Sequence, residues 1–309
     1  MKLFCISIII AFLISGATSC AGKAAVISGD IPDDTEFIQG LLDSEGSEIT
    51  IPARETPWIT RPLFLTGKSE KTIRFEPGCR ITAKEGEFID TEDSLLSLNN
   101  CSDIILTGYE AVLEMRKSDY TKRPYKKSQW RHGISIRECE SVTIEGLTIR
   151  FTGGDGVYLG QAKGEEVNRN IVLKDLRLED NHRQGVSVIS VEGFIMEGCI
   201  VTGTKGTQPM AGIDFEPNSN ANSLTGCVIR DTVFENNSGA GILFYFHKLK
   251  AKHPPVDITF ENCISRNNMM SVLMLSVPRG LRGSIRFIDC DLSDFKRIKR
   301  TKTLTVDFL

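Results

Sequence analysis

A short strand that begins with glycine recurs along this chain and constrains its fold more than any other feature. Three copies lie close together, at residues 154–160 (Gly-Asp-Gly-Val-Tyr-Leu-Gly), 183–189 (Arg-Gln-Gly-Val-Ser-Val-Ile) and 210–216 (Met-Ala-Gly-Ile-Asp-Phe-Glu). Aligning their glycines gives two columns, an apolar one of Val157, Val186 and Ile213 and a polar one of Tyr158, Ser187 and Asp214. Because side chains alternate across a strand, the apolar column predicts an interior face and the polar column an outward face.

The same unit continues on both sides of these three copies. Aligned glycines or their equivalents fall at positions 133, 156, 185, 212, 241 and 272, so the repeats are 23 to 31 residues long. Most repeats hold two further short strands, such as residues 142–144 and 147–149. Three short strands in such a period predict one coil of a solenoid, whose apolar face is buried only when coils stack. Turn residues such as Asn181 and Asn237 are expected to adopt special backbone angles and form ladders between coils.

The residues before and after the repeat complete this pattern. Asp34 is the expected N-cap of a short helix with an apolar stripe of Phe37, Ile38, Leu41 and Leu42. Short strands follow at Ile51-Pro52-Ala53 and before Glu76-Pro77-Gly78, and alternating residues 304–308 predict a last strand.

Residues 30 to 295 resemble the right-handed parallel β-helix of the pectate-lyase-like superfamily, including its N-terminal capping helix. The resemblance implies an all-β fold, a right-handed parallel β-helix solenoid with a short N-terminal capping helix. The superfamily contains pectin and alginate lyases, glycosidases, epimerases, tailspikes and adhesins, so the fold does not fix the function.

The start of the chain has the pattern of an export signal. Met1 and Lys2 precede an apolar run from Leu3 to Ile14, which is too short for a comfortable transmembrane span. Small residues then lead to Cys20, as in the lipobox of bacterial lipoproteins, and the resemblance implies lipid attachment at Cys20. Plain secretion, with Cys20 incidental, stays open.

These features predict three segments, a signal peptide at 1–19, a linker at 20–32 and a β-helix domain at 33–309. We expect an exported protein, either an outer-membrane or periplasmic bacterial lipoprotein or a secreted one. It would contact a membrane only through the N-terminal lipid.

Seven cysteines follow Cys20, and their positions indicate packing. Cys199, Cys263 and Cys290 recur at one point of the repeat, where other repeats carry Leu147 or Leu176. A column shared with leucine is interior, which predicts buried free thiols. Because the sequence has no Cys-x-x-Cys pair, no metal site is expected from the cysteines.

Polar residues gather on one stripe of about four consecutive coils. His132, Asp155 and Gln184 share one column, Glu216 and Tyr245 share another, and His182 and Arg183 lie in the adjoining turn. Stacked coils are about 4.8 Å apart, so these side chains should converge. The candidate catalytic residues are Asp155, Asp214, Glu216, His182 and Arg183.

Two carboxylate pairs on this stripe predict acid–base chemistry. Asp155 and Asp214 lie two coils apart, about 10 Å, and Asp214 and Glu216 lie about 6.5 Å apart on one strand face. Both approach the roughly 6.5 to 9.5 Å of inverting glycosidases, in which one carboxyl group protonates the leaving oxygen and the other activates water. His182 and Arg183 would orient substrate or tune the pKa of the carboxylates. A turn hydrogen bond for Asp155 and surface ion pairs for the others remain open.

Residues 181–188 resemble the Gly-His-Gly strand of the polygalacturonase group, the family 28 glycoside hydrolases. Residues 153–156 resemble the Asp-Asp strand one coil earlier, although only one aspartate is present. Arg131-His132-Gly133 stands where that group has Asn-Thr-Asp. This partial resemblance implies glycoside hydrolysis.

Two other functions remain open. A polysaccharide lyase would use Arg183 as its base, with Asp155 and Asp214 holding a calcium ion. Without lyase chemistry we expect no cofactor. A non-catalytic glycan-binding or adhesion protein would instead use Trp130 and Tyr158 as platforms for sugar rings.

Two basic segments favour an acidic glycan, such as a uronate polymer, as the partner. Residues 116–131 combine Lys and Arg with Tyr120, Tyr125 and Trp130, and residues 247–253 form a second basic loop in a chain of net charge -3. Solvated surface loops are the alternative. A pI near 5.9 and the export signal argue against nucleic acid. The expected substrate-binding residues are Trp130, Arg131, His132, Tyr158, Gln184, Ser187 and Tyr245.

Overall fold

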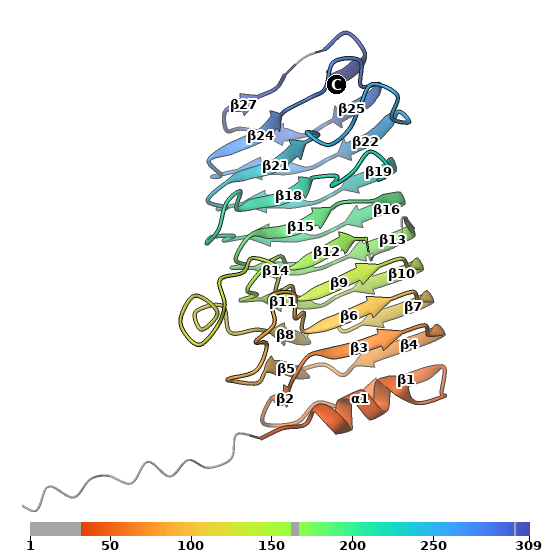
Figure 1. The fold of residues 1–309 in the computed structure, drawn as a ribbon, viewed down its shortest axis with the longest axis vertical. Helices are drawn as coiled ribbons and strands as arrows, with labels where there is room; N and C mark the ends of the chain where they lie inside the picture. Colours follow the sequence, from red (N-terminus) through yellow and green to blue (C-terminus); the bar gives the residue numbers. More distant parts are fainter. Residues whose placement is uncertain (1–31, 162–166, 300) are drawn as a thin grey trace, which may run out of the picture. The chain divides into compact units, whose positions relative to one another are not determined.

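The computed structural model describes residues 32–161, 167–299 and 301–309. The predicted signal peptide and Cys20 lie outside the described residues. Within them the chain forms one helix, α1 (Thr35–Asp43), followed by a stack of coils that each add a strand to three sheets. Figure 1 shows the coils in chain order from α1 to the C-terminal strands.

The three sheets run the length of the stack. Sheet A contains β1 (Glu48–Ile51), β4 (Ser69–Phe75), β7 (Ser102–Thr107), β10 (Glu140–Glu145), β13 (Asn168–Lys174), β16 (Val191–Glu197), β19 (Leu224–Arg230), β22 (Val256–Glu261), β25 (Gly283–Ile288) and β28 (Leu304–Phe308). Sheet B contains β2 (Trp58–Thr60), β5 (Arg80–Ala83), β8 (Val112–Glu114), β11 (Thr148–Arg150), β14 (Arg177–Glu179), β17 (Ile200–Thr202), β20 (Val233–Glu235), β23 (Ile264–Arg266) and β26 (Asp291–Leu292). Sheet C contains β3 (Leu63–Thr66), β6 (Leu96–Asn99), β9 (Ile134–Arg137), β12 (Val157–Gly160), β15 (Gln184–Val188), β18 (Ala211–Phe215), β21 (Ala240–Tyr245), β24 (Met270–Leu275) and β27 (Lys296–Arg297).

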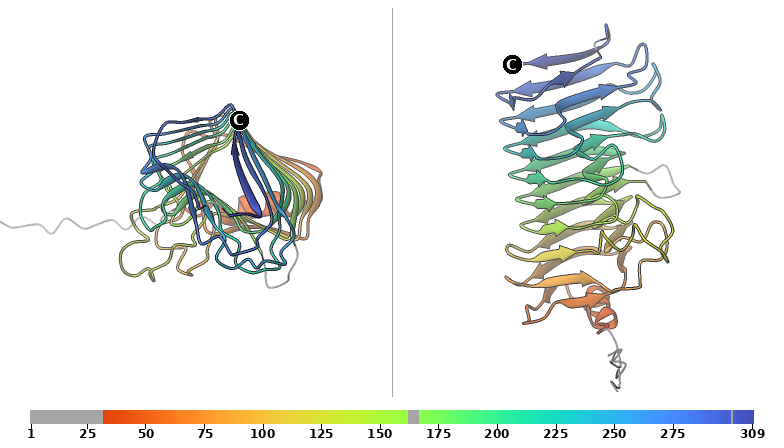
Figure 2. Two further views of the ribbon diagram at one scale, coloured as in Figure 1. Left: turned by 90° about the horizontal axis from the view of Figure 1, so that it is seen from above. Right: turned by 90° about the vertical axis from the view of Figure 1, so that its left-hand side faces the viewer.

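Neighbouring strands pair in parallel in all three sheets, so the fold is the predicted parallel β-helix. Figure 2 shows the three faces from the end of the stack. Strands β9 and β18 lie at the two ends of the predicted polar stripe. Only two strands of sheet C, β12 and β15, lie between them. This arrangement brings residues that are far apart in the sequence onto one face.

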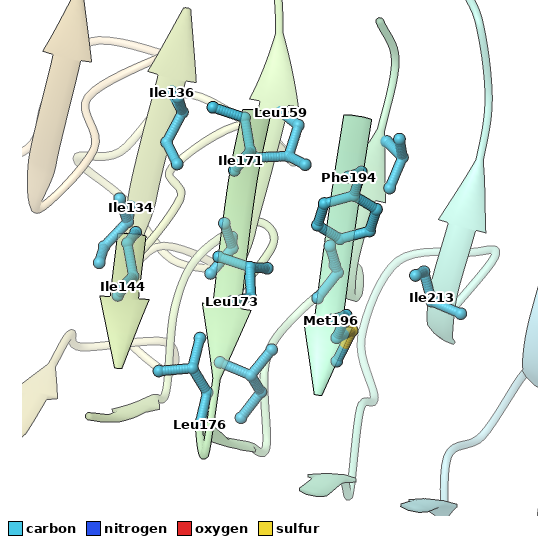
Figure 3. Packing of buried hydrophobic residues seen from close by; sticks show 14 of the residues in the cluster. Ile134, Ile136, Ile144, Leu159, Ile171, Leu173, Leu176, Phe194, Met196 and Ile213 are labelled. Carbon is cyan, nitrogen blue, oxygen red and sulfur yellow. The ribbon is translucent and has the colours of Figure 1, made fainter. Parts of the chain in front are cut away.

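The strand register matches the predicted columns. Val157 pairs with Val186, and Val186 pairs with Ile213. These three side chains are fully buried, and Figure 3 shows side chains of successive coils packed in a continuous core. Full burial of such a side chain stabilises a fold by about 1.5 to 3 kcal/mol, so each added coil extends one shared core.

The capping helix differs from expectation at its N-terminus. Ile38 and Leu42 are buried as predicted, whereas Phe37 is half exposed and stacks on Trp58 with ring centroids 5.0 Å apart. Asp34 is the N-cap residue, but its side chain makes no capping hydrogen bond. Its carboxylate instead accepts the Ile59 N–H at 2.8 Å and pairs with Arg54. This backbone N–H from another part of the fold and this cation take the place of the helix N–H groups that the carboxylate would cap.

The cysteines lie in the core, as predicted. All seven described cysteines are free thiols, and six are buried. The register places Cys263 beside Cys290 in one column. Burial raises the pKa of Cys199 to about 12, so this thiol stays protonated and packs as an apolar group.

The C-terminal residues form the predicted last strand. β28 pairs with β25, and Phe308 stacks on Phe287 with centroids 4.9 Å apart. Among the described helices, none is long and apolar enough to cross a bilayer.

Asparagines link turns of successive coils, as predicted. Asn236 has a φ of 58°, in the left-handed region that asparagine tolerates. The Asn237 side chain donates to the Val201 carbonyl at 3.2 Å and to Asn268 Oδ1 at 3.0 Å, and it accepts the Thr204 N–H at 3.1 Å. Asn237 is almost fully buried, so these bonds have no water to replace them.

We predict that Asn237→Ala lowers the free energy of unfolding by about 2 to 3 kcal/mol, because it leaves a buried amide and carbonyl unpaired. Urea denaturation measures the change. Asn218→Ala is the matched control, since Asn218 is exposed, and should change stability by less than about 0.5 kcal/mol. Equal effects of the two substitutions would contradict the structural role of the ladder.

Candidate active site

Four consecutive strands of sheet C, β9, β12, β15 and β18, bring most of the predicted site residues together. The turn before β15 holds Arg183, which lies between residues of neighbouring coils. Its guanidinium group lies 3.7 Å from Asp155 Oδ2 and 2.5 Å from Glu216 Oε2. It also donates to Ser187 Oγ at 3.4 Å. Arg183 is therefore the centre of a charged cluster.

Arg183 keeps its proton in this cluster. Its side chain is only 10% exposed. Burial alone would lower the pKa of Arg183, but the charges of Asp155 and Glu216 outweigh this effect and raise it. One planar guanidinium contacts both carboxylates, which places their oxygens within roughly 9 Å of each other.

Asp214 lies at the base of the cluster and is fully buried. Its Oδ2 accepts a hydrogen bond from Gln184 Nε2 at 2.6 Å, and Gln184 Oε1 accepts the Ala211 N–H at 2.8 Å. Burial raises the pKa of Asp214 well above its ordinary value, and the charge of Glu216 adds to the effect. Asp214 therefore favours its protonated form.

Asp214 and Glu216 are electrostatically coupled. The charge of Glu216 adds to burial in raising the pKa of Asp214, so Asp214 favours its neutral form beside Glu216. Asp214 Oδ1 has no hydrogen-bond partner among the described residues, and Glu216 Oε2 accepts a hydrogen bond from Arg183. The separation of about 6.5 Å expected for this pair stays a prediction.

Asp155 is a buried carboxylate without a hydrogen-bond donor. Neither carboxylate oxygen has a hydrogen-bond partner among the described residues, and the side chain is fully buried. The proposed turn hydrogen bond for Asp155 is therefore absent. Buried polar groups are almost always paired, so an unpaired carboxylate indicates a place for water or a reacting group.

His132 and Tyr158 form one wall of the cluster. His132 Nδ1 accepts the Asp155 N–H at 3.1 Å and lies 3.3 Å from Asp155 Oδ2. The His132 ring stacks on the Tyr158 ring with centroids 4.5 Å apart. The Arg137 guanidinium lies over the Tyr158 ring, 5.2 Å from its centroid. A ring with Nδ1 as an acceptor carries its proton on Nε2.

Most of the polar column is buried, which corrects the expectation that it faces solvent. Ser187 and Asp214 have no exposed surface, and His132 and Gln184 are also buried, so in this arrangement these four side chains cannot contact a glycan directly. Their neighbours Arg183 and Glu216 contact them from the outer side. Glu216, at 24% exposure, is the carboxylate of the cluster that reaches the surface.

His182 makes no hydrogen bond to the carboxylates, and its role in orienting substrate or tuning their pKa stays a prediction. Its Nε2 bonds Thr207 Oγ1 at 2.9 Å, and its ring lies along the neighbouring turn at Gly206. Burial and the ammonium group of Lys117 lower the pKa of His182, so the ring favours its neutral form. His182 and Arg183 are consecutive in the turn, but their side chains contact partners on opposite sides of it.

Arg131 has a structural position, which corrects its expected role in substrate binding. The side chain is fully buried, and its guanidinium donates to the carbonyls of Phe88, Ile89 and Lys126. Tyr120 and Tyr125 lie 5.5 and 5.6 Å from it. Arg131 therefore fixes the inserted loop of residues 116–131 to the stack of β-helix coils.

The remaining predicted binding residues lie apart from the cluster or at its edge. Trp130 is 45% exposed and lines a hollow of about 230 Å³ beside the inserted loop. Tyr245 is half-buried in the coil after Glu216, and its ring stacks on His247 at 5.7 Å. Tyr158 is half-buried beneath Arg137.

Sequence reasoning missed a cavity of about 690 Å³, which includes Phe151, His182 and Lys205 in its lining. Lys205 lies in the turn one coil after His182. Aligning the turns of neighbouring coils, as well as their strands, would have placed Lys205 near His182. In the part of the chain that the structure describes, no three His, Cys, Asp or Glu side chains are arranged to hold a metal ion.

Comparisons with known proteins address the family. The model described as "Right handed beta helix region" matches residues 125–281. Uncharacterized protein YclG of Bacillus subtilis (strain 168) is 25% identical over 124 residues, 37% of this chain and 21% of that protein. The chain therefore spans about a fifth of this curated relative.

Solved structures agree in fold. A family 28 exopolygalacturonase of Yersinia enterocolitica matches with a TM-score of 0.60 and 14% identity, over 89% of this chain and 63% of that one. A polygalacturonase of Erwinia carotovora ssp. carotovora matches with a TM-score of 0.52 and 13% identity, over 90% and 94% of the two chains. At these identities the likeness shows a shared fold. With the family model covering half of its length, the chain belongs to the right-handed β-helix family.

Proposed function

We propose that this protein is an exported polysaccharide-active enzyme, an inverting glycoside hydrolase that acts on an acidic glycan. The observation that carries the proposal is the pairing of two unlike carboxyl sites across Arg183. On one side lie Glu216 and Asp214, whose raised pKa favours its protonated form, and on the other lies Asp155, a buried carboxylate without a hydrogen-bond donor. Carboxyl groups in contrasting environments supply the acid and the base of many hydrolases.

The chemistry follows from these assignments. The proton of Asp214 passes to the glycosidic oxygen as the bond to the anomeric carbon breaks. Water attacks that carbon from the opposite face and gives its proton to Asp155. The upper bound of roughly 9 Å between the Asp155 and Glu216 oxygens held by Arg183 is compatible with the roughly 6.5 to 9.5 Å at which inverting enzymes accommodate this water. Arg183 would balance the charges of the two sites through the reaction.

Substrate access requires a local opening. Asp155 and Asp214 are fully buried, whereas Arg183 and Glu216 form the surface contact above them. A glycan would reach the acid only after the Arg183–Glu216 ion pair separates. An acidic sugar suits this step, because its carboxylate can replace Glu216 at the guanidinium.

A lyase is less well supported. Its base would be Arg183, but the adjacent carboxylates raise the pKa of Arg183 and so make proton abstraction harder. A non-catalytic glycan-binding protein is the second candidate. The complete burial of Asp155 and Asp214 favours it, since a binding protein needs no access to these groups.

One experiment separates the three functions. The protein is incubated with a panel of uronic-acid polymers and neutral glycans, and both new reducing ends and the ultraviolet absorbance of unsaturated sugars are followed. A hydrolase gives reducing ends without absorbance, a lyase gives both, and a binding protein gives neither while retaining the glycan. Absence of new reducing ends across the panel would refute the proposed hydrolysis.

We predict that Asp214→Asn lowers kcat by roughly 10²- to 10⁴-fold, because the amide cannot donate the proton. The fold should persist, since Asp214 favours its neutral form and Asn has the same shape. Asp257→Asn is the control, because Asp257 is a partly exposed carboxylate paired with Arg286 on sheet A. Wild-type turnover by Asp214→Asn would remove the assignment of the acid.

The raised pKa of Asp214 also predicts a pH dependence. Its contribution to stability is complete below the unfolded value of 3.8 and is lost as the pH rises through the higher folded-state value. The native protein should therefore lose stability relative to Asp214→Asn as the pH increases above 3.8, and activity should fall as the acid ionises. Thermal unfolding of both proteins between about pH 4 and pH 9 measures this. A difference that is constant with pH would show that Asp214 does not titrate as proposed.

A further inference from the structure

The inserted loop between β8 and β9 encloses three adjoining hollows that the hydrolytic cluster does not use. In Figure 1 this loop stands out from the stack of coils. The hollows measure about 690, 310 and 230 Å³. His182 and Thr121 border both the first and the second, and Lys127, Ser128 and Thr207 border both the second and the third. We call this continuous depression the loop groove.

The loop groove is positively charged in a protein of net charge -3. Six cationic side chains and three carboxylates line it. Each carboxylate is already paired, Glu114 with Arg150, Asp119 with Arg116 and Asp180 with Lys117. Four exposed cations form no ion pair with any described residue: Lys122, Arg123, Lys127 and Lys205. These charges are free to meet an anionic ligand.

The uncharged lining suits sugar rings. Trp130 exposes 45% of its surface at one end of the groove, and Phe151 lines the other. Between them, His182 lines the two larger hollows, and Thr207, its hydrogen-bond partner, lines the two smaller ones. Aromatic faces, hydroxyl groups and a neutral imidazole bind the faces and hydroxyls of saccharides, whereas a small anion needs none of them.

The position of the groove ties it to the hydrolytic cluster. His182 faces the groove, while Arg183, the next residue, holds Asp155 and Glu216. A chain lying in the groove would thus pass within one turn of the buried acid and base. The combined volume is larger than one small-ligand site of about 300 to 1,000 Å³ requires, which indicates several sugar units.

We infer that the loop groove binds a stretch of acidic oligosaccharide and holds it beside the Arg183 cluster. This rests on the proposed function only in that the polymer bound is also the substrate. The groove would select the chain by its repeated negative charges and its rings, and the cluster would act on one bond.

A triple substitution in the groove tests this against a matched loop. Lys122→Ala, Arg123→Ala and Lys127→Ala are combined in one protein. The control combines Lys248→Ala, Lys250→Ala and Lys252→Ala, which removes the same charge from an exposed basic loop that borders none of the three hollows. Both carry Asp214→Asn so that bound glycan is not cleaved, and circular dichroism checks that each is folded.

Calorimetry then measures binding of oligogalacturonate, chondroitin sulfate, a neutral xyloglucan oligosaccharide and single-stranded DNA. We expect an acidic saccharide to bind best, with affinity reduced about tenfold or more by the groove substitutions and less than about twofold by the control. Binding of either acidic chain supports the inference; tighter binding of chondroitin sulfate, which carries both carboxylates and sulfates, than of oligogalacturonate would indicate that the sulfates contribute. Equal losses in both triple variants, no binding of an acidic saccharide, or tighter binding of DNA would overturn it.

The result is separable from the test of hydrolysis. If the groove variants lose binding while the wild-type protein cleaves no glycan, the groove stands and the proposed hydrolase fails. If the wild-type protein cleaves an acidic glycan and the groove substitutions, made without Asp214→Asn, leave KM unchanged, the hydrolase stands and the groove fails.

Discussion

Hydrogen bonding between successive parallel coils is the constraint on which the rest of this structure depends. The Gly133 N–H donates to the Asp155 carbonyl and the Gly156 N–H to the Gln184 carbonyl, so each coil fixes the position of the next. Glycine is needed at this column because a Cβ on Gly156 would lie 2.7 Å from the Gly185 carbonyl oxygen. Residues more than 20 positions apart in sequence thereby become neighbours at about 4.8 Å, and a functional cluster can be assembled from single residues of several repeats.

The same stacking creates an electrostatic problem that Arg183 resolves. Three acidic residues, Asp155, Asp214 and Glu216, come from two coils on either side of the coil of Arg183 and converge in a region with little solvent. One cation balances part of this charge, and the raised pKa of Asp214 removes another part by keeping a proton in the cluster. Removing Arg183 would leave buried carboxylates without a counter-ion, which is more costly than losing a surface ion pair. The charge of the cluster is thus tied to the stability of the coils.

The sequence correctly predicted which residues of successive coils align, because strand register determines this. It failed for features that depend on the direction of individual side chains. The columns through Val157 and Asp214 were correct because glycine spacing fixes the coil, and the three-sheet fold follows from it. The burial of Arg131 depends on the path of residues 116–131, which no repeat constrains. Likewise His182 and Arg183 point to opposite sides of one turn, a difference that alignment in columns cannot express.

We propose different tasks for the two regions, with the loop groove holding the polymer and the Arg183 cluster breaking one bond. In this mechanism Asp155 and Asp214 act from opposite sides of the scissile bond. Proton NMR of the first product, recorded before the anomers equilibrate, tests this directly on whichever acidic glycan is cleaved. We expect a product of inverted anomeric configuration, and a product that retains the configuration of the substrate would rule the mechanism out.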